Sequence, residues 1–228
     1  MKFPCFSLFS TLLIGIIGDC AAGEFAAYHE MNLEGWKIHV EQVMVDKNDP
    51  RIFLALRALR KRLKEVKREI PSQHIEQLQG VPLWISKNNG NHAEYYFFER
   101  RVHRNGINPK MLGGIEFKNI NILLAMQHTI PSLIIHELAH AYHKINYEKI
   151  DQQIMHAYIN SENKQLYKEV STIRNHEGHA EYASKSPFEY FADLTSMYYG
   201  SNPYYPHDRD ELREHDPVGF KMIEDTWK

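Results

Sequence analysis

Cysteine is nearly absent from this chain. Only Cys5 and Cys20 occur in 228 residues, and both lie close to the N-terminus. After residue 20, a framework of disulfide bonds or a metal site built from several thiolates is therefore excluded. The fold must be stabilised by a hydrophobic core, which a composition of 43% hydrophobic residues allows.

A strong excess of charge is missing too, because the formal net charge is only -2. It gives no reason to predict a nucleic-acid partner or binding to a membrane surface. Internal repeats and low-complexity segments are absent after residue 23, and the length suits one domain better than two.

A long hydrophobic run is also lacking. The longest apolar stretch, residues 6–17, is too short to span a bilayer comfortably, and it follows Lys2 and precedes the small residues 20–23. This order is typical of a secretory signal peptide. We expect residues 1–22 to be a signal peptide and residues 23–228 to form one exported domain, periplasmic or secreted, without stable membrane insertion. An uncleaved anchor is the alternative.

Strand signals come early in the chain, and helix signals dominate its second half. An amphipathic helix with a basic face begins at Asp49-Pro50 and ends at Pro71; that face is either solvated surface or an anion-binding strip. We expect strands at 81–86, 92–98 and 114–120, with the second paired to the first. We expect further helices at 131–148, 150–170, 187–200 and from 217 onward. Strands followed by helices predict an α+β fold.

One motif carries recognisable chemistry. His136-Glu137-Leu138-Ala139-His140 places two histidines four residues apart, which is about 400° around an α-helix. Both imidazoles can then reach one Zn²⁺, while Glu137 can hydrogen-bond a water molecule beside it. A core helix with incidental histidines is the alternative interpretation.

Such a zinc site needs a third protein ligand. His143 lies on the same straight helix, so it cannot converge with the other two histidines on one tetrahedral centre. Glu189 lies in the first turn of a later helix, with Asp193 one turn further on the same face. Glu189 can complete the site, and Asp193 can accept the second N–H of a ligand imidazole.

Two alternatives to this assignment stay open. Ser186 and Glu189 also match a capping box, in which Glu189 would serve the helix N-terminus. His176 and His179 could act as ligands or hydrogen-bond donors in place of the expected residues.

These motifs resemble the gluzincin peptidases, in which HExxH is followed on a second helix by ExxxD. The 48 residues between His140 and Glu189 are similar to the spacing in the anthrax lethal factor catalytic domain and the Pro-Pro endopeptidases. HELAHAYH, P-x-E-Y-F-A and ELREHDP also resemble segments of a group of small exported bacterial proteins. The resemblance implies a zincin-like fold, with a small mixed sheet packed against the active-site helix and further helices.

The resemblance also implies an activity. It predicts a secreted zinc metalloendopeptidase with one Zn²⁺ per chain and a protein or peptide substrate. Tyr182, seven residues before Glu189, takes the place of a catalytic tyrosine, and Asp193 stands where lethal factor has Glu. The strand at 114–120 would form the cleft edge along which a peptide adds itself. A zinc amidase acting on cell-wall peptide crosslinks and a non-catalytic zinc-binding module are the alternative functions.

Overall fold

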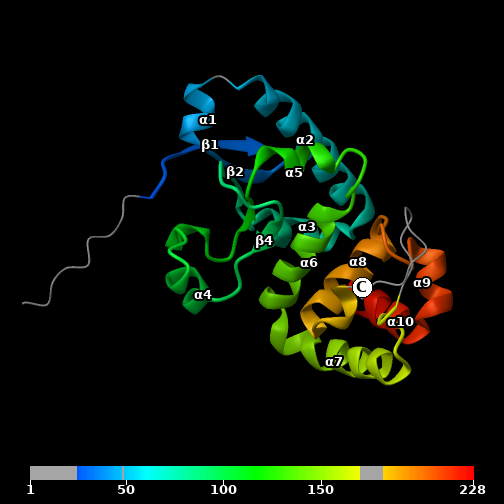
Figure 1. Ribbon diagram of the computed structural model, residues 1–228. Coiled ribbons are helices and arrows are strands. Elements are labelled where there is room, and N and C mark those ends of the chain that lie inside the picture. Colours follow the sequence, from blue (N-terminus) through cyan, green and yellow to red (C-terminus); the bar gives the residue numbers. More distant parts are fainter. Residues whose placement is uncertain (1–24, 48, 170–181) are drawn as a thin grey trace, which may run out of the picture.

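The computed structural model describes residues 25–47, 49–169 and 182–228, so the expected signal peptide lies outside the described residues. The described part has a five-stranded sheet and an α+β architecture (Figure 1). The strands are β1 (Tyr28–Leu33), β2 (Trp36–Glu41), β3 (Leu83–Ile85), β4 (Ala93–Tyr95) and β5 (Ile115–Phe117). The helices are α1 (Gln42–Asp46), α2 (Pro50–Glu69), α3 (Ser72–Gln79), α4 (Glu99–Arg104), α5 (Ile120–Ala125), α6 (Leu133–Ile145), α7 (Tyr147–Lys164), α8 (Pro187–Tyr199), α9 (Arg209–His215) and α10 (Pro217–Thr226).

The sheet is mixed, with the strand order β1-β2-β3-β5-β4. β2, β3 and β5 are parallel, and the two edge strands, β1 and β4, are antiparallel to their neighbours. Two expectations are therefore wrong: β4 pairs with β5 instead of β3, and β4 forms the edge in place of the strand expected at 114–120. All three side chains of β5 are buried, which suits a strand enclosed between two others.

The hairpin of β1 and β2 was not predicted. Its two-residue turn is Glu34-Gly35, with φ values of 58° and 102°, and Leu33 pairs with Trp36 across it. Positive φ at both central residues is what a tight hairpin turn requires. Gly35 also lies so close to the side chain of Gln79 that a Cβ atom there would overlap it.

The helix boundaries follow the capping signals in the sequence. Asp49, Ser186 and Asp216 each accept a hydrogen bond from the first turn of α2, α8 and α10, and each of these helices has proline at its start. The predicted helices at these three places are confirmed. The helix expected at 150–170 begins earlier, at Tyr147, and ends at Lys164.

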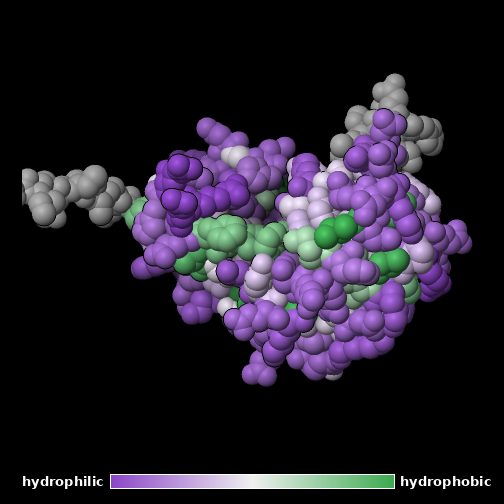
Figure 2. Space-filling view, turned by 90° about the horizontal axis from the view of Figure 1, so that it is seen from below, coloured by the Kyte–Doolittle hydropathy of each residue, from purple (hydrophilic) through white to green (hydrophobic). Residues whose placement is uncertain are grey.

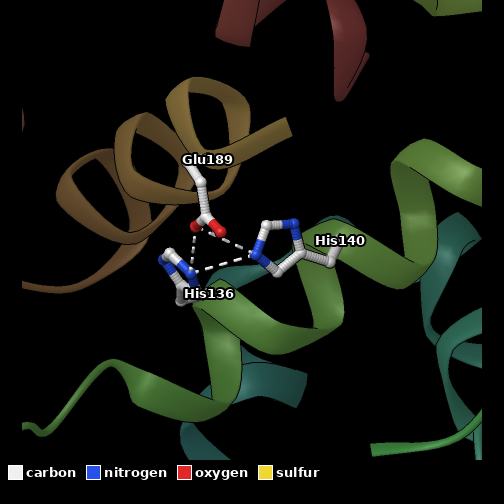
Figure 3. A group of neighbouring side chains, drawn as sticks. All are labelled: His136, His140 and Glu189. Atoms are coloured by element: carbon white, nitrogen blue, oxygen red, sulfur yellow. Dashed lines mark hydrogen bonds and ion pairs between the residues drawn. The ribbon is translucent and has the colours of Figure 1, made fainter. Parts of the chain in front are cut away.

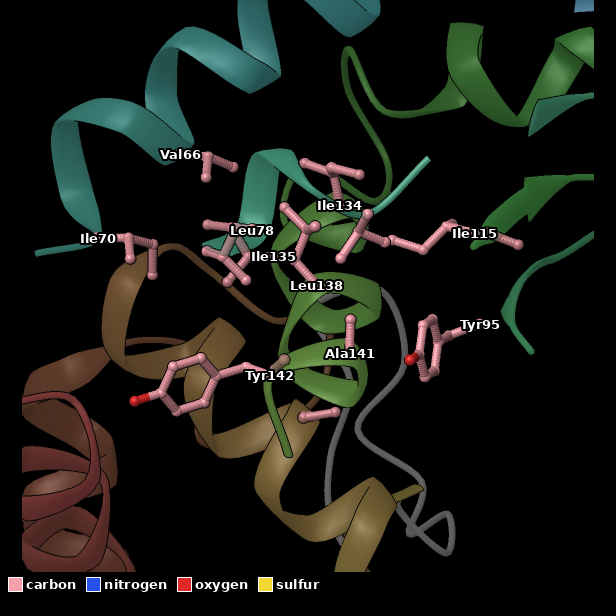
Figure 4. Packing of buried hydrophobic residues seen from close by; sticks show 14 of the residues in the cluster. Val66, Ile70, Leu78, Tyr95, Ile115, Ile134, Ile135, Leu138, Ala141 and Tyr142 are labelled. Atoms are coloured by element: carbon pink, nitrogen blue, oxygen red, sulfur yellow. The ribbon is translucent and has the colours of Figure 1, made fainter. Parts of the chain in front are cut away.

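The main core lies between one face of the sheet and the helices. Ile38, Leu83, Ile115 and Phe117 are fully buried. Figure 4 shows that α6 turns Ile134, Ile135 and Leu138 toward residues of α2, α3 and the sheet. On its other side α6 packs against α8. α6 therefore packs on both the sheet and the helical half of the molecule.

The face shown in Figure 2 is mainly hydrophilic, with a band of hydrophobic side chains across it. Exposed large hydrophobic residues include Phe98, Ile145 and Tyr147. Among the described residues, no helix combines the length and the apolar character needed to cross a membrane.

Asp216 joins three elements in the helical half. Its carboxylate is fully buried and accepts hydrogen bonds from the Tyr190 hydroxyl at 2.5 Å, the Tyr167 hydroxyl at 3.2 Å and the Gly219 N–H at 2.9 Å. It caps α10 and fixes that helix against α8.

We expect Asp216→Ala to lower the free energy of unfolding by about 2–4 kcal/mol, because it removes a cap and a buried acceptor of charge-assisted hydrogen bonds. Chemical denaturation would measure this. Asp210→Ala is the control, because that side chain is 86% exposed and should change stability by less than about 0.5 kcal/mol. Equal stability of the two variants would contradict the role of Asp216.

Candidate metal centre

The helix α6 carries the two histidines on a buried, rigid element. Ile134, Leu138 and Ala141 are buried against the core, and this anchors the backbone of the motif. His136 and His140 project from the opposite side toward α8, and their Nε2 atoms lie 3.1 Å apart. The expected one-turn separation is therefore realised in the folded chain.

The helix α8 brings Glu189 to the same point. The Ser186 hydroxyl accepts the Glu189 backbone N–H at 3.2 Å and so caps the helix. The Glu189 carboxylate instead points to the two histidines (Figure 3), with its Oε2 atom 3.3 Å from the Nε2 atom of each. Capping is thus done by the serine, and the glutamate side chain faces the imidazoles.

These three atoms form a nearly equilateral triangle, with sides of 3.1, 3.3 and 3.3 Å. Tetrahedral zinc with arms of about 2.0–2.1 Å places its ligand atoms about 3.3 Å apart. The triangle therefore has the dimensions that a zinc ion requires, and the residues could hold a metal ion. His143 is not in this group: its Nε2 atom lies 3.1 Å from Asp151.

Asp193 lies behind the first histidine. Its Oδ1 atom is 2.8 Å from His136 Nδ1, as expected for an acceptor of the second N–H of that ring. With the proton on Nδ1, the lone pair of Nε2 faces the centre of the triangle. His140 differs, because its buried Nδ1 has no hydrogen-bond partner among the described residues.

The charges of the group are strongly coupled. Burial alone would raise the pKa of Glu189, but hydrogen bonds from His136 and His140 outweigh it and hold that pKa far below its usual value. Burial would lower the pKa of His136, but Asp193 and Glu189 raise it well above the usual value. The metal-free group therefore favours a proton at the position where a cation could bind.

Glu137 projects beside the triangle from the same helix. It is 5% exposed, and burial raises the pKa of its carboxyl. Its Oε2 atom accepts a hydrogen bond of 2.9 Å from the backbone N–H of Tyr95 on β4. Glu137 lines the same cavity as the three candidate ligands.

That cavity has a volume of about 720 Å³ and is bounded by several elements. β4 forms one wall, and residues 201–204, which follow α8, form another. Ile122, Ile130 and Leu133 add an apolar wall that sequence reasoning missed. Ile122 lies in α5, Ile130 lies between α5 and α6, and Leu133 begins α6. In the sequence they look like ordinary core residues.

Tyr182 is also on the cavity wall, but it is 49% exposed and its ring lies 3.1 Å from the Lys185 ammonium. Its place in the cleft fits the expectation, and its catalytic role stays a prediction. His176 and His179 lie outside the described residues.

We expect Glu189→Ala to weaken zinc binding by more than about 100-fold, because it removes a direct ligand. Ser186→Ala is the matched control: it should lower stability by about 1 kcal/mol through loss of the cap and keep one zinc per chain. Elemental analysis of both purified variants measures this. Wild-type zinc content in Glu189→Ala would leave that residue without a role as a ligand.

Asp193→Asn should weaken zinc binding by about 10- to 100-fold, because the carboxylate that orients His136 is lost. Competition with a chromophoric chelator gives the affinity. The control is Asp151→Asn, which changes the other carboxylate paired with an α6 histidine, His143, outside the metal group. An equal effect of both substitutions would show that Asp193 acts on the fold instead of on the site.

Comparisons of the chain with protein families, with curated proteins and with solved structures gave no match. The assignment of this site therefore depends on the motif and on its geometry.

Proposed function

We propose that this protein is a zinc-dependent peptidase with a zincin-like fold. In this proposal His136, His140 and Glu189 hold the metal and Glu137 is the general base. The observation that carries the proposal is the triangle of ligand atoms, 3.1–3.3 Å on each side, with a buried carboxylate next to it on the same helix.

The donor set favours zinc. Two imidazole nitrogens and one carboxylate oxygen with an open fourth position are characteristic of catalytic zinc sites, whereas Mg²⁺ and Ca²⁺ prefer oxygen ligands. When bound, zinc would polarise a carbonyl group and make a water molecule more acidic.

Glu137 is suited to proton transfer. A buried carboxyl with a raised pKa holds a proton more readily than an exposed one, so it can accept a proton from water and return it to the leaving amine. A purely structural metal site has no use for such a base, which argues against the non-catalytic alternative. We assign Tyr182, on the wall of the cavity, to stabilising the oxyanion that forms as water attacks.

The edge strand β4 favours a peptide substrate. Ala93 and Tyr95 of this strand line the cavity, and an edge strand can pair with an extended chain by main-chain hydrogen bonds. A peptide crosslink of the cell wall would offer the same amide chemistry, so a zinc amidase stays the second candidate. The apolar leader expected at residues 1–22 supports an exported enzyme in either case.

Glu137→Gln should retain one zinc per chain and lower kcat by about 10²- to 10⁴-fold, because the general base is lost while the ligands stay. His140→Ala should lose both zinc and activity. Glu148→Gln, an exposed glutamate on α7, is the control and should match the wild type.

Hydrolysis of casein and of purified cell wall would be measured side by side on these proteins. Zinc-dependent cleavage of casein supports the peptidase, and cleavage of cell wall alone supports the amidase. Full activity of Glu137→Gln would overturn the mechanism in both cases.

A further inference from the structure

The edge strand makes a direct contact with the proposed base. The Tyr95 backbone N–H on β4 donates to Glu137 Oε2 on α6 at 2.9 Å, and the bond is buried. It joins two elements that are 42 residues apart in the sequence.

This N–H is not needed by the sheet. Two residues at odd positions from Tyr95 bond toward the β5 side, because the Tyr96 N–H donates to Gly114, just before β5, at 3.0 Å, and the Lys118 N–H, just after β5, donates to His92 at 3.3 Å. Backbone groups alternate in direction along an antiparallel strand, so the N–H of Tyr95 points away from β5. Glu137 is therefore the group that occupies this outward position of the edge.

The strand is held firmly at this point. The Tyr95 ring is 6% exposed and packs edge-on against Phe97, with ring centroids 4.8 Å apart. Tyr95 is also in register with the buried Ile115 of β5. The amide thus has a fixed position relative to α6.

We propose that the backbone N–H of Tyr95 is a positioning group for Glu137, fixing the rotation of its carboxylate so that Oε1 faces the reacting water. The proposal rests on the assigned role of Glu137 as base. Because Oε2 is engaged by the strand, only one oxygen is left for proton transfer. A peptide that adds to β4 cannot use this N–H and has only the other outward groups of the strand for pairing.

The sharpest test replaces the amide of residue 95 by an ester, using the α-hydroxy analogue of tyrosine, so that only the N–H is lost and the buried ring is kept. We expect kcat to fall by about 10- to 100-fold, because a misplaced catalytic group loses rate, while KM stays within about threefold and zinc content is unchanged. The same analogue at Tyr28 is the control.

Tyr28 is a suitable control because it lies on β1, the opposite edge strand. The preceding Ala27 carbonyl accepts the Gln42 N–H and so faces the sheet, and the N–H of Tyr28 therefore points away from the sheet. Its ester should have the kcat of the wild type. Equal kcat for the two esters would overturn the proposal.

A second measurement does not depend on turnover. Hydrogen exchange of the Tyr95 amide should be slow in the wild type and at least about tenfold faster in Glu137→Ala, while the Tyr28 amide is unchanged. Protection of Tyr95 that persists in Glu137→Ala would show that the contact is not the one described, and the proposal would be wrong. If the exchange result holds but the wild type hydrolyses neither casein nor cell wall, the contact is structural and the proposed function fails with the positioning role.

Discussion

The packing of α6 against α8 is the constraint on which the candidate centre depends. α6 alone supplies two imidazoles at a helical spacing, and that pair cannot define a three-ligand site. The third candidate ligand atom comes from α8 and lies 3.3 Å from both nitrogens. A shift of one residue between the helices would turn the Glu189 carboxylate by about 100° away from them. The register of this one interface therefore decides whether the three candidate ligand atoms come together.

The same interface of α6 and α8 buries several ionisable side chains, and each of them needs a partner. Buried ionisable groups are unfavourable unless they are paired. Here Glu189 faces both imidazole rings, Asp193 faces the far nitrogen of one, and Glu137 accepts the Tyr95 backbone N–H. The contact of Asp193 with His136 Nδ1 compensates burial and also orients that ring, so that its Nε2 atom faces Glu189. Stability of the metal-free fold and readiness for a cation thus come from the same contacts.

The meeting of His136, His140 and Glu189 could be predicted because its signals are local. A spacing of four residues fixes a shared helix face, and Ser186-Pro187 fixes where α8 begins, which sets the direction of Glu189.

The strand order could not be predicted in this way, because pairing depends on which buried surfaces meet. β4 is followed by β5 in the chain and pairs with it, while β3 and β5 are neighbours across an intervening segment. The contact of the Tyr95 N–H could not be predicted from sequence patterns, because every residue except proline has the same backbone N–H. The sequence signal for the hairpin turn at Glu34-Gly35 is weak. Glycine favours the positive φ that such a turn requires, but glutamate is not typical of the first turn position.

The strand order has a kinetic consequence. β2 pairs with β3 over some 45 residues of chain and β3 with β5 over about 30, so the sheet forms through contacts of high sequence separation. α6 buries its apolar side on this sheet and on α2, and α8 then docks on α6. We therefore expect the three candidate ligand atoms to come together only late in folding. Binding of zinc by all three residues would then require the native topology. Binding by the two histidines of an isolated α6 helix would require only that this helix forms.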